Sequence, residues 1–380
     1  MSRILEIAGM TFVFIIIFLS YLVVVFGLIT GWIKAMAVAV PGVVKEKFIS
    51  VIVAFRNEEK TIGNLISDLQ QQEYPRDKFE VILINDHSED NSVSVINEAL
   101  RGPISSKLMN NASPGKKSAL TKGIRHSIGT IMVTTDADCR METGWLRSIN
   151  NSFYDDTIKM TFGPVKFQED GTVFQSMQAI EFASLIGSGA ATAAFGFPTL
   201  CNGANLAFTK DVFTETGGYE GNEHIASGDD EFLMRKIEAK YPGSIRFNSH
   251  RDSLVTTAPQ KTLISFLNQR LRWAGKWRYH DGTNSKLLAI YIFLFHFTVI
   301  VLPFFVLMGD VSAYVLIGLL LAKAAIEFFF LRPVCSWLGI RLRWISFIVL
   351  QLTYPLYAVG VALAALFKTP FWKGRPLTSS

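Results

Sequence analysis

Several signals are missing from this 380-residue sequence, and each absence narrows the class of protein. Only three cysteines occur, Cys139, Cys201 and Cys335, without a Cys-x-x-Cys spacing, which argues against a disulfide framework and a zinc knuckle. The six histidines form no His-Glu-x-x-His pattern, and no predicted strand leads into Gly-x-Gly-x-x-Gly. A zinc protease and a dinucleotide-binding domain therefore lose their main signals. We expect the three thiols to be reduced and structural, as suits a domain facing the cytosol.

Charged residues are scarce and unevenly placed. They make up 18% of the chain, against about 25% in ordinary soluble domains. Hydrophobic residues reach 49%, and the mean hydropathy is +0.29. Residues 332–380 contain Lys and Arg but no Asp or Glu, although the net charge is only +5. Positive charge that flanks apolar segments is typical of a membrane protein and speaks against a nucleic-acid partner.

Long apolar runs predict membrane-spanning helices, since about 20 apolar residues cross a bilayer. These runs lie near residues 9–30, 287–308, 311–331 and 344–367. Lys323 and Glu327 are four residues apart in the third run, so we expect them to pair inside a helical bundle. Pro303 and Pro355 mark candidate breaks. The basic flanks predict a multi-pass protein of the cell (inner) membrane with its main domain in the cytoplasm, while the exact number of spans and the side of the C-terminus stay open.

The segment after the first span alternates strand and helix patterns. Strands are expected at 49–55, 79–85, near 104–108 and at 131–135, with helices at about 58–72, after 90 and at 117–127. This alternation predicts an α/β domain with a mainly parallel sheet, accompanied by transmembrane α-helices. The expected division is an anchor (1–31), a cytosolic α/β domain (32–257), a basic amphipathic interfacial helix (258–286), about three further transmembrane helices (287–367) and a basic tail (368–380).

Acidic residues follow three of the predicted strands. Glu58 comes after the first, Asp86 after the second, and the pair Asp136 and Asp138 after the fourth. Ligands of open α/β sheets bind at the carboxyl ends of the strands, so these residues predict one acidic rim. Their hard oxygen atoms suit Mg²⁺ or Mn²⁺ bound together with substrate phosphates. Helix capping is the alternative role, above all for Asp86.

Seven segments, taken in order, resemble motifs of the membrane-bound members of glycosyltransferase family 2. They read VIVAFRNEE, VILINDHSEDNS, GKKSALTKGI, TTDADC, CNGANLAFTKDVFTETGGY, SGDDEFLMRK and QRLRW, within about residues 48–273. Relatives of this kind include ceramide glucosyltransferase and the cellulose, hyaluronan and poly-N-acetylglucosamine synthases. The resemblance implies a GT-A nucleotide-sugar domain followed by a Gln-x-x-Arg-Trp motif. It also implies an inverting, Mg²⁺- or Mn²⁺-dependent transfer of a hexose from a UDP-sugar.

On the donor side, the resemblance implies roles for six residues. Ala54 and Glu58 would border the nucleoside, and Asp86 would contact the uracil or the ribose. The others serve the diphosphate end: Lys117 approaching it, Asp136 contacting the nucleotide and Asp138 holding the metal. The sequence departs from the family pattern at Ala54, where many members have Pro.

On the acceptor side, Asp230 matches the catalytic base. Asp229 precedes it where the family usually has Glu, so either acid could serve as the base, and either could instead cap the following helix. Gly203 would let the backbone approach the donor sugar closely. The remaining matched residues are Gln269, Arg272 and Trp273, which would close over the diphosphate and the acceptor.

Three functions are compatible with this pattern. With one span before the domain and at most three after it, the chain is small for a polymer-conducting channel, so we favour transfer of one or a few sugars to a lipid-linked or hydrophobic acceptor at the membrane. The second is a processive polysaccharide synthase that extends a saccharide acceptor, with a membrane partner subunit supplying helices. The third is a catalytically inactive scaffold or transport subunit, against which the intact acids speak. The sugar, the acceptor, the linkage and the oligomeric state stay open.

Overall fold

The computed structural model describes residues 2–38, 44–102, 104–169, 171–221, 228–275, 283–367, 371–372 and 375–376. Backbone contacts divide the chain into two compact units. Unit 1 comprises Met1–Trp32, Glu169–Gly187 and Gln260–Thr378, and unit 2 comprises Ile33–Gln168, Ser188–Pro259 and Ser379–Ser380. Both units combine segments that are distant in sequence, so neither is one continuous stretch of chain.

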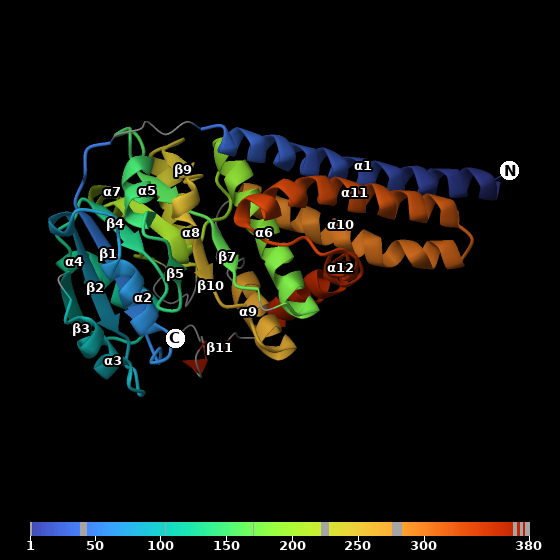
Figure 1. The fold of residues 1–380 in the computed structure, drawn as a ribbon. Helices are drawn as coiled ribbons and strands as arrows, with labels where there is room; N and C mark the ends of the chain where they lie inside the picture. Colours follow the sequence, from blue (N-terminus) through green and yellow to red (C-terminus); the bar gives the residue numbers. More distant parts are fainter. Residues whose placement is uncertain are drawn as a thin grey trace. The chain divides into compact units, whose positions relative to one another are not determined.

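Unit 2 contains a seven-stranded sheet with the order β3-β2-β1-β4-β8-β6-β9 (Figure 1). Its strands are β1 (Ile49–Phe55), β2 (Phe79–Asn85), β3 (Ser105–Asn110), β4 (Ile131–Thr134), β6 (Met160–Phe162), β8 (Leu206–Thr209) and β9 (Ile245–Phe247). A smaller sheet joins β5 (Arg140–Met141), β10 (Val255–Thr257) and β7 (Val165–Phe167). The strands β3, β2, β1 and β4 pair in parallel, whereas β8 is antiparallel to both β4 and β6. The predicted α/β class with a mainly parallel sheet is confirmed.

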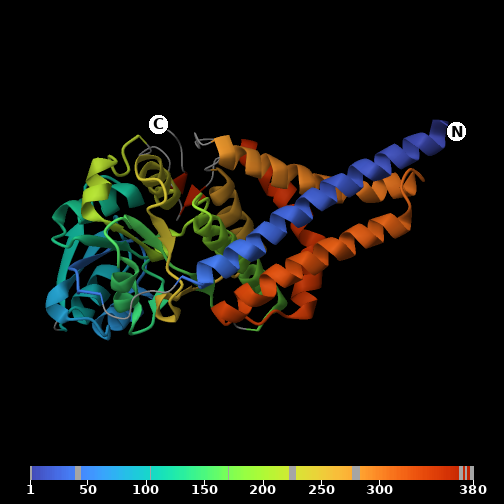
Figure 2. The same cartoon turned by 90° about the horizontal axis from the view of Figure 1, so that it is seen from above.

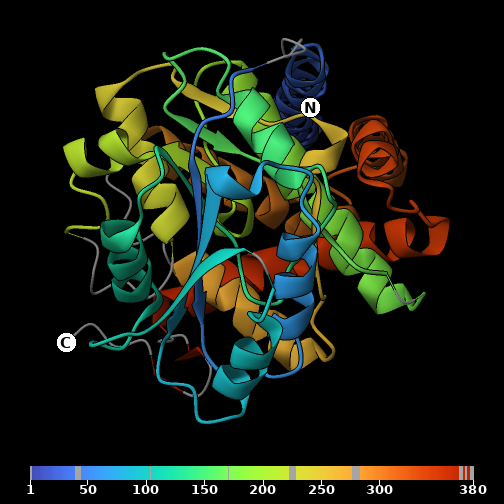
Figure 3. The ribbon, with the colours of Figure 1, turned by 60° about the vertical axis from the view of Figure 1, so that its left-hand side comes forward.

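Helices cover both faces of this sheet. They are α2 (Ile62–Gln70), α3 (Ser92–Ala99), α4 (Lys116–His126), α5 (Trp145–Ser152), α7 (Lys210–Glu215) and α8 (Asp229–Lys240), with short 3₁₀ turns at Arg76–Lys78, Gly203–Asn205 and Arg251–Ser253. Figure 3 shows α2 and α4 on opposite sides of β1 and β2. A Cβ at Gly123 of α4 would lie only 2.5 Å from Ile52 and 2.7 Å from Ile84. Glycine therefore lets α4 pack closely on the sheet, with its first turn near the carboxyl ends of the strands.

The continuous apolar runs explain the two central strands. Residues Ile49–Val53 of β1 are all buried, as expected for a parallel strand covered on both faces. The register pairs Ile49 with Phe79 and Phe55 with Asn85, so β1 and β2 end side by side. The backbone N–H of Asp86 then donates to the Phe55 carbonyl at 2.8 Å. The polar residues after both strands are thereby brought to one edge of the sheet.

Unit 1 is helical (Figure 2). Its long helices are α10 (Thr283–Leu307), α11 (Ala313–Leu338), α12 (Trp344–Phe367) and α1 (Ser2–Met36) up to Trp32, the last residues of α1 belonging to unit 2. It also includes α9 (Leu263–Gly275), the first part of α6 (Val173–Ala194) and the short strands β11 (Phe371–Trp372) and β12 (Arg375–Pro376). Four of these helices are long and apolar enough to cross a membrane, as predicted. Residues 276–282 of the predicted interfacial helix and most of the basic tail lie outside the described residues.

The expected breaks at two prolines are wrong. Helix α10 continues through Pro303, and α12 continues through Pro355. A proline inside a helix removes one backbone hydrogen bond, but neighbouring helices and local adjustments make this tolerable in apolar bundles. Both prolines therefore lie within continuous helices.

The predicted pairing of Lys323 and Glu327 is confirmed. The ammonium of Lys323 lies 2.8 Å from a carboxylate oxygen of Glu327 and donates to Gln351 of α12, also at 2.8 Å. Tyr21 of α1 donates its hydroxyl to Glu327 at 2.5 Å. Three helices of unit 1 thus share one polar network, which satisfies charges that would be costly if they faced lipid.

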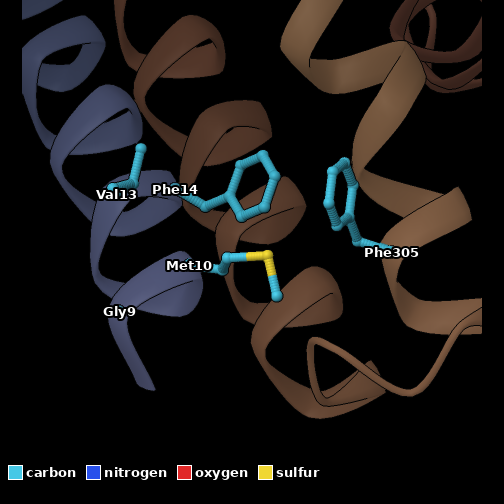
Figure 4. Close-up of a pocket in the computed structure, with 5 residues that line it drawn as sticks. All are labelled: Gly9, Met10, Val13, Phe14 and Phe305. Carbon is cyan, nitrogen blue, oxygen red and sulfur yellow. The ribbon is translucent and has the colours of Figure 1, made fainter. Parts of the chain in front are cut away.

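A hollow of about 540 Å³ in unit 1 is lined by Gly9, Met10, Val13, Phe14 and Phe305. Figure 4 shows Met10 and Phe14 of α1 directed toward the ring of Phe305 on α10. The described lining carries no ionisable side chain, so it offers no group for acid–base or metal chemistry.

Candidate functional site

Asp86, at the end of β2, is almost fully buried, with 1% of its surface exposed. Its carboxylate accepts hydrogen bonds from the Asn111 side-chain amide at 3.0 Å and from the Gly115 backbone N–H at 3.0 and 3.1 Å. His87 Nδ1 lies 3.3 Å from the same carboxylate. Asp86 therefore fastens the loop between β3 and α4, and it caps no helix of its own. This loop delivers the first residue of α4, Lys116, to the edge of the sheet.

Lys116 brings two carboxylates of unit 2 together. Its ammonium lies 2.6 Å from Asp136, just after β4, and 3.8 Å from Asp229, the first residue of α8. Burial works against the charge of Lys116, but the neighbouring Asp136 and then Asp229 raise its pKa well above the ordinary value. The ammonium is thus held charged between acids from two distant parts of the sequence.

The adjacent lysine is placed differently. Lys117, which the sequence pattern singled out for the diphosphate, is 7% exposed, and its ammonium lies 5.1 Å from the centre of the Phe232 ring. Consecutive helical residues point about 100° apart, so the two lysines leave α4 in different directions. Sequence reasoning did not single out Lys116, which contacts Asp136 and Asp229. The role expected for Lys117 at the diphosphate stays a prediction.

The predicted base, Asp230, lies in the first turn of α8. One of its carboxylate oxygens accepts the backbone N–H of Gly203 at 2.9 Å, and the other accepts the N–H of Glu231 at 2.8 Å. The Gly203 carbonyl in turn accepts the hydroxyl of Thr134, at the end of β4, at 2.9 Å. The residue that caps α8 is Gly228, with φ +82°, so Asp229 is not the cap.

Gly203 is not required by its own backbone angles or by tight packing. An added Cβ would meet Asp229 at 3.5 Å and Asp230 at 3.6 Å, which are ordinary contact distances. The space left by the absent side chain therefore borders the two carboxylates. This arrangement is compatible with the predicted close approach of the backbone to a sugar.

Tyr219 is a second residue that sequence reasoning missed. It is 4% exposed, and its hydroxyl has no hydrogen-bond partner in the part of the chain that the structure describes. Burial first, and then the charges of Asp229 and Asp230, raise its pKa well above the ordinary value. A buried hydroxyl without a hydrogen-bond partner costs about 1–3 kcal/mol, and the charges of Asp229 and Asp230 act on this one. No motif at Tyr219 itself would have revealed it.

Three further predicted residues lie along the same strand ends. Ala54, within β1, is half-buried. Glu58 accepts the hydroxyl of Thr61 at 2.7 Å, just before α2 begins. Asp138, two residues after Asp136, is half-buried and accepts the hydroxyl of Thr257 at 3.3 Å.

The donor set suits a hard divalent cation. Asp136, whose side chain is 40% exposed, and Asp138 offer carboxylate oxygens, the ligands that Mg²⁺ and Mn²⁺ prefer. Among the described residues, no three His, Cys, Asp or Glu side chains form a ready-made ligand group. Such ions often bind through one or two carboxylates plus substrate phosphates, so the residues present fit that mode. Cys139 does not join them, because burial first, and then Asp136 and Asp138, raise the pKa of its thiol well above the ordinary value.

The Gln-x-x-Arg-Trp residues lie on α9 in unit 1, whereas the other nine predicted site residues lie in unit 2. The most deeply buried residue of this motif is Arg270, not Arg272. Arg270 and Glu181 of α6 are each 5% exposed and form an ion pair, with Arg270 Nε donating to Glu181 at 2.9 Å. The Arg270 guanidinium also lies 4.3 Å from the ring centres of both Phe266 and Trp273.

The wider network around Arg270 reaches α12. Tyr357 donates its hydroxyl to Glu181, so one carboxylate joins α6, α9 and α12 within unit 1. The side-chain oxygen of Gln269 accepts a hydrogen bond from Arg270. The ring of Trp273 packs against Phe182 at 5.9 Å between centres. Gln269 and Trp273 are thereby held through Arg270 and its neighbours, a pairing that residue spacing along the sequence does not reveal.

Part of the chain is similar in sequence to a known protein family. Residues 50–214 match the family model described as glycosyl transferase family 2. The chain contains a glycosyltransferase family 2 domain. The matched segment runs from β1 through α7 and includes Asp86, Asp136, Asp138 and Gly203.

Individual curated relatives share about a quarter of their aligned residues with this chain. The chain is 25% identical over 203 residues to glycosyltransferase AglE of Haloferax volcanii, covering 51% of this chain and 62% of the relative. It is 24% identical over 255 residues to poly-beta-1,6-N-acetyl-D-glucosamine synthase of Staphylococcus epidermidis, covering 65% and 60%. The chain thus spans about three-fifths of the length of these curated relatives.

A solved structure shares the fold over nearly the whole chain. Mannosyltransferase PcManGT from Pyrobaculum calidifontis, crystallised with GDP-Man and Mn²⁺, aligns with a TM-score of 0.58 at 19% identity, covering 95% of this chain and 98% of that one. The GT-A fold implied by the sequence motifs is thereby confirmed.

Proposed function

We propose that this chain is a membrane-bound, inverting glycosyltransferase that moves a hexose from a UDP-sugar to a lipid-linked or hydrophobic acceptor. The observation that carries the proposal is the contact of Lys116 with Asp136 and Asp229, immediately beside Asp230. Cations and acids gathered at the carboxyl edge of a GT-A sheet suit a nucleoside diphosphate and the proton transfer that accompanies its departure.

Asp230 is the group that accepts the proton. An acceptor hydroxyl must lose its proton as it attacks the sugar carbon, and a positioned carboxylate can take that proton. The hydrogen bonds from the N–H groups of Gly203 and Glu231 hold Asp230 in one orientation. A carboxylate has further lone pairs beyond these two bonds, so it can still receive the hydroxyl. Attack from the side opposite the leaving group inverts the sugar centre.

The leaving diphosphate needs positive charge. Lys116 supplies an ammonium at the acids, and exchanging Asp136 for a phosphate oxygen keeps it paired. Lys117, the next residue of α4, would approach the diphosphate as well. Asp138, together with Asp136, would hold Mg²⁺ or Mn²⁺, which supplies charge stabilisation to a leaving diphosphate when bound. Asp86 contributes by fixing the loop that presents Lys116. Ala54 and Glu58 border the nucleoside side of the same edge.

The acceptor belongs to the membrane. Four helices are long and apolar enough to cross a bilayer, so an acceptor that is itself lipid-linked can reach the protein within the membrane plane. The basic segments after the domain favour the cytoplasmic face of the cell membrane. Gln269, Arg272 and Trp273 of α9 would close over the diphosphate and the acceptor. A processive polysaccharide synthase is the second candidate, because the poly-beta-1,6-N-acetyl-D-glucosamine synthase of Staphylococcus epidermidis is among the matched relatives.

The test uses the full chain in purified membranes or nanodiscs. A panel of labelled UDP-hexoses, UDP-N-acetylhexosamines and GDP-mannose is incubated with Mn²⁺ or Mg²⁺ and a lipid extract, and nucleotide release is followed while products are identified by mass spectrometry. We expect release with a UDP-sugar, and a labelled product that partitions into organic solvent. The Asp230→Asn protein, prepared alongside, is the matched control and should release almost none.

The outcomes separate the candidates. A labelled product that stays with the aqueous or insoluble fraction and grows in length would favour the polysaccharide synthase. Release with GDP-mannose alone would overturn the choice of donor but not the reaction type. No nucleotide release with any donor, at a level equal to that of Asp230→Asn, would reject the enzyme and leave a scaffold or transport subunit.

A further inference from the structure

Two exposed phenylalanines stand together on unit 2. Phe195 and Phe197, just after α6, are 42% and 54% exposed, and their rings stack with centres 6.0 Å apart and an interplanar angle of 9°. The backbone fixes this arrangement: Phe197 N–H donates to the Thr192 carbonyl at 3.1 Å, and Gly196 adopts φ +84°, which favours glycine. Burying such a side chain is worth about 1.5–3 kcal/mol, so a rigid, solvent-facing pair indicates a surface with a partner.

The end of α1 identifies the partner. The ammonium of Lys34, in the last turn of α1, lies 5.5 Å from the centre of the Phe195 ring. Residues 7–33, which precede it, carry no charged side chain. At a rise of about 1.5 Å per residue this stretch is about 40 Å long, enough to cross the hydrocarbon core of about 30 Å and reach the headgroups. If α1 crosses a bilayer, its length would bring Lys34 to the headgroups, with the ring of Phe195 beside it.

We propose that Phe195 and Phe197 enter the bilayer interface next to α1, while Lys34 meets anionic lipid headgroups. The aromatic rings supply apolar area and the ammonium supplies attraction to phosphate, the combination that binds a protein segment to a lipid surface. Ile33, 61% exposed in the same turn of α1, extends the apolar surface. The occupant is lipid because the patch continues a helix that is long and apolar enough to span the membrane.

This contact bears on the acceptor. Gly203, whose N–H donates to Asp230, lies six positions after Phe197. A fully extended chain of six residues reaches about 20 Å, so Gly203 lies within about that distance of Phe197, and the Asp230 carboxylate lies 2.9 Å beyond the Gly203 nitrogen at most. This step rests on the proposed function: an acceptor hydroxyl on a lipid headgroup would need to rise only a short way to reach Asp230.

The membrane contact is tested in the full chain, reconstituted in vesicles of phosphatidylcholine and phosphatidylglycerol. Phe197→Cys and a control, Ile128→Cys, are labelled with an environment-sensitive fluorophore, and the signal of the labelled unmutated protein is subtracted. Ile128 is 65% exposed in unit 2, and its N–H donates to Glu80 of β2, so it reports on the same domain at the sheet. We expect a blue-shifted emission at position 197 and loss of more than half of it to lipids carrying a spin label near the headgroup, with neither effect at 128.

Equal quenching at both positions, or none at 197, would overturn the proposal. Shielding at 197 that ignores the spin-labelled lipids but grows with protein density would assign the patch to a second copy of the chain and would overturn it too. The acceptor step has its own readout. The double variant Phe195→Ser/Phe197→Ser should raise the KM for the lipid acceptor while leaving hydrolysis of the donor unchanged; an unchanged KM with intact quenching in the labelled protein would reject only that step.

Discussion

Each unit of this protein contains a buried or half-buried ion pair, and the two pairs differ in how far their side chains are exposed to solvent. In unit 1, Arg270 and Glu181 are each 5% exposed, and Tyr357 donates a further hydrogen bond to the same carboxylate. In unit 2, the side chains of Lys116 and Asp136 are 25% and 40% exposed. The first pair is enclosed by helices and holds them together, whereas the second can exchange partners with a ligand. Both pairs join a basic and an acidic side chain, so solvent exposure, more than residue type, distinguishes the structural pair of unit 1 from the ligand-accessible pair of unit 2.

The largest effect is expected at the site itself. Asp230→Asn removes the group that takes the acceptor proton, so transfer should fall by about 10²–10⁴-fold while nucleotide binding is retained. Nucleotide release and equilibrium binding measure the two quantities separately. Asp211→Asn, on the exposed surface of α7, is the matched control and should turn over normally. Asp138→Asn should also abolish transfer, and normal turnover of both site variants would contradict the assigned roles.

Removing one partner of the buried Arg270–Glu181 pair should lower the stability of the protein. Glu181→Leu leaves Arg270 buried without its carboxylate, so we expect a loss of about 3–5 kcal/mol in the free energy of unfolding. Thermal unfolding in nanodiscs measures this loss. The double variant Glu181→Leu/Arg270→Met should recover part of the stability, because no charge is then left unpaired. If Glu181→Leu alone were as stable as the double variant, Arg270 would not be buried without a partner, and the enclosed ion pair would be contradicted.

Removing the ammonium from the Lys116–Asp136 pair should lower nucleotide affinity more than it lowers stability. In Lys116→Gln the ammonium that would pair with the diphosphate is gone, and a hydrogen bond to a charged group is worth about 1.5–3 kcal/mol, so nucleotide affinity should fall by about ten- to a hundredfold. Because the pair is partly exposed, its contribution to stability should be at most about 1 kcal/mol. Calorimetric titration with UDP and thermal unfolding give both values. Lys122→Gln on the same helix should bind UDP normally.

The smallest effect is expected from removing the hydroxyl group of Tyr219. Tyr219→Phe removes a buried hydroxyl that has no partner in the described part of the protein, so stability should be unchanged or rise by about 1 kcal/mol. If the hydroxyl serves the neighbouring Asp229 and Asp230 during the reaction, kcat should nevertheless fall by about tenfold. Tyr154→Phe, at a partly exposed tyrosine of unit 2, is the control. A stability loss without a change in kcat would assign Tyr219 to packing alone.

Much of the fold was predictable because its signals are local. The apolar runs of β1 and β2 predicted both strands with the bounds that the structure has. The spacing of Lys323 and Glu327 predicted their pairing, since residues four apart in a helix are neighbours. Pro303 and Pro355 misled because a local preference against helix was outweighed by packing within a helical bundle.

The candidate site was predictable only in outline. Its acids follow strands whose ends must meet in a parallel sheet, so their convergence was expected. That Lys116 contacts Asp136 and Asp229 depends on how α4 packs on the sheet, where Gly123 lies close to Ile52 and Ile84. Nothing in the local pattern around Tyr219 shows that its hydroxyl would be buried beside two carboxylates.

By itself, the sequence determined the class of the fold, the apolar helices and the edge of the sheet at which the acids gather. These follow from hydrophobic periodicity and from motif order, which are properties of neighbouring residues. Only the tertiary structure decided that Lys116 joins Asp136 to Asp229, and that Arg270 is enclosed with Glu181. Such pairings join residues far apart in the chain, and they depend on the packing of whole helices and strands against one another, which no local pattern contains.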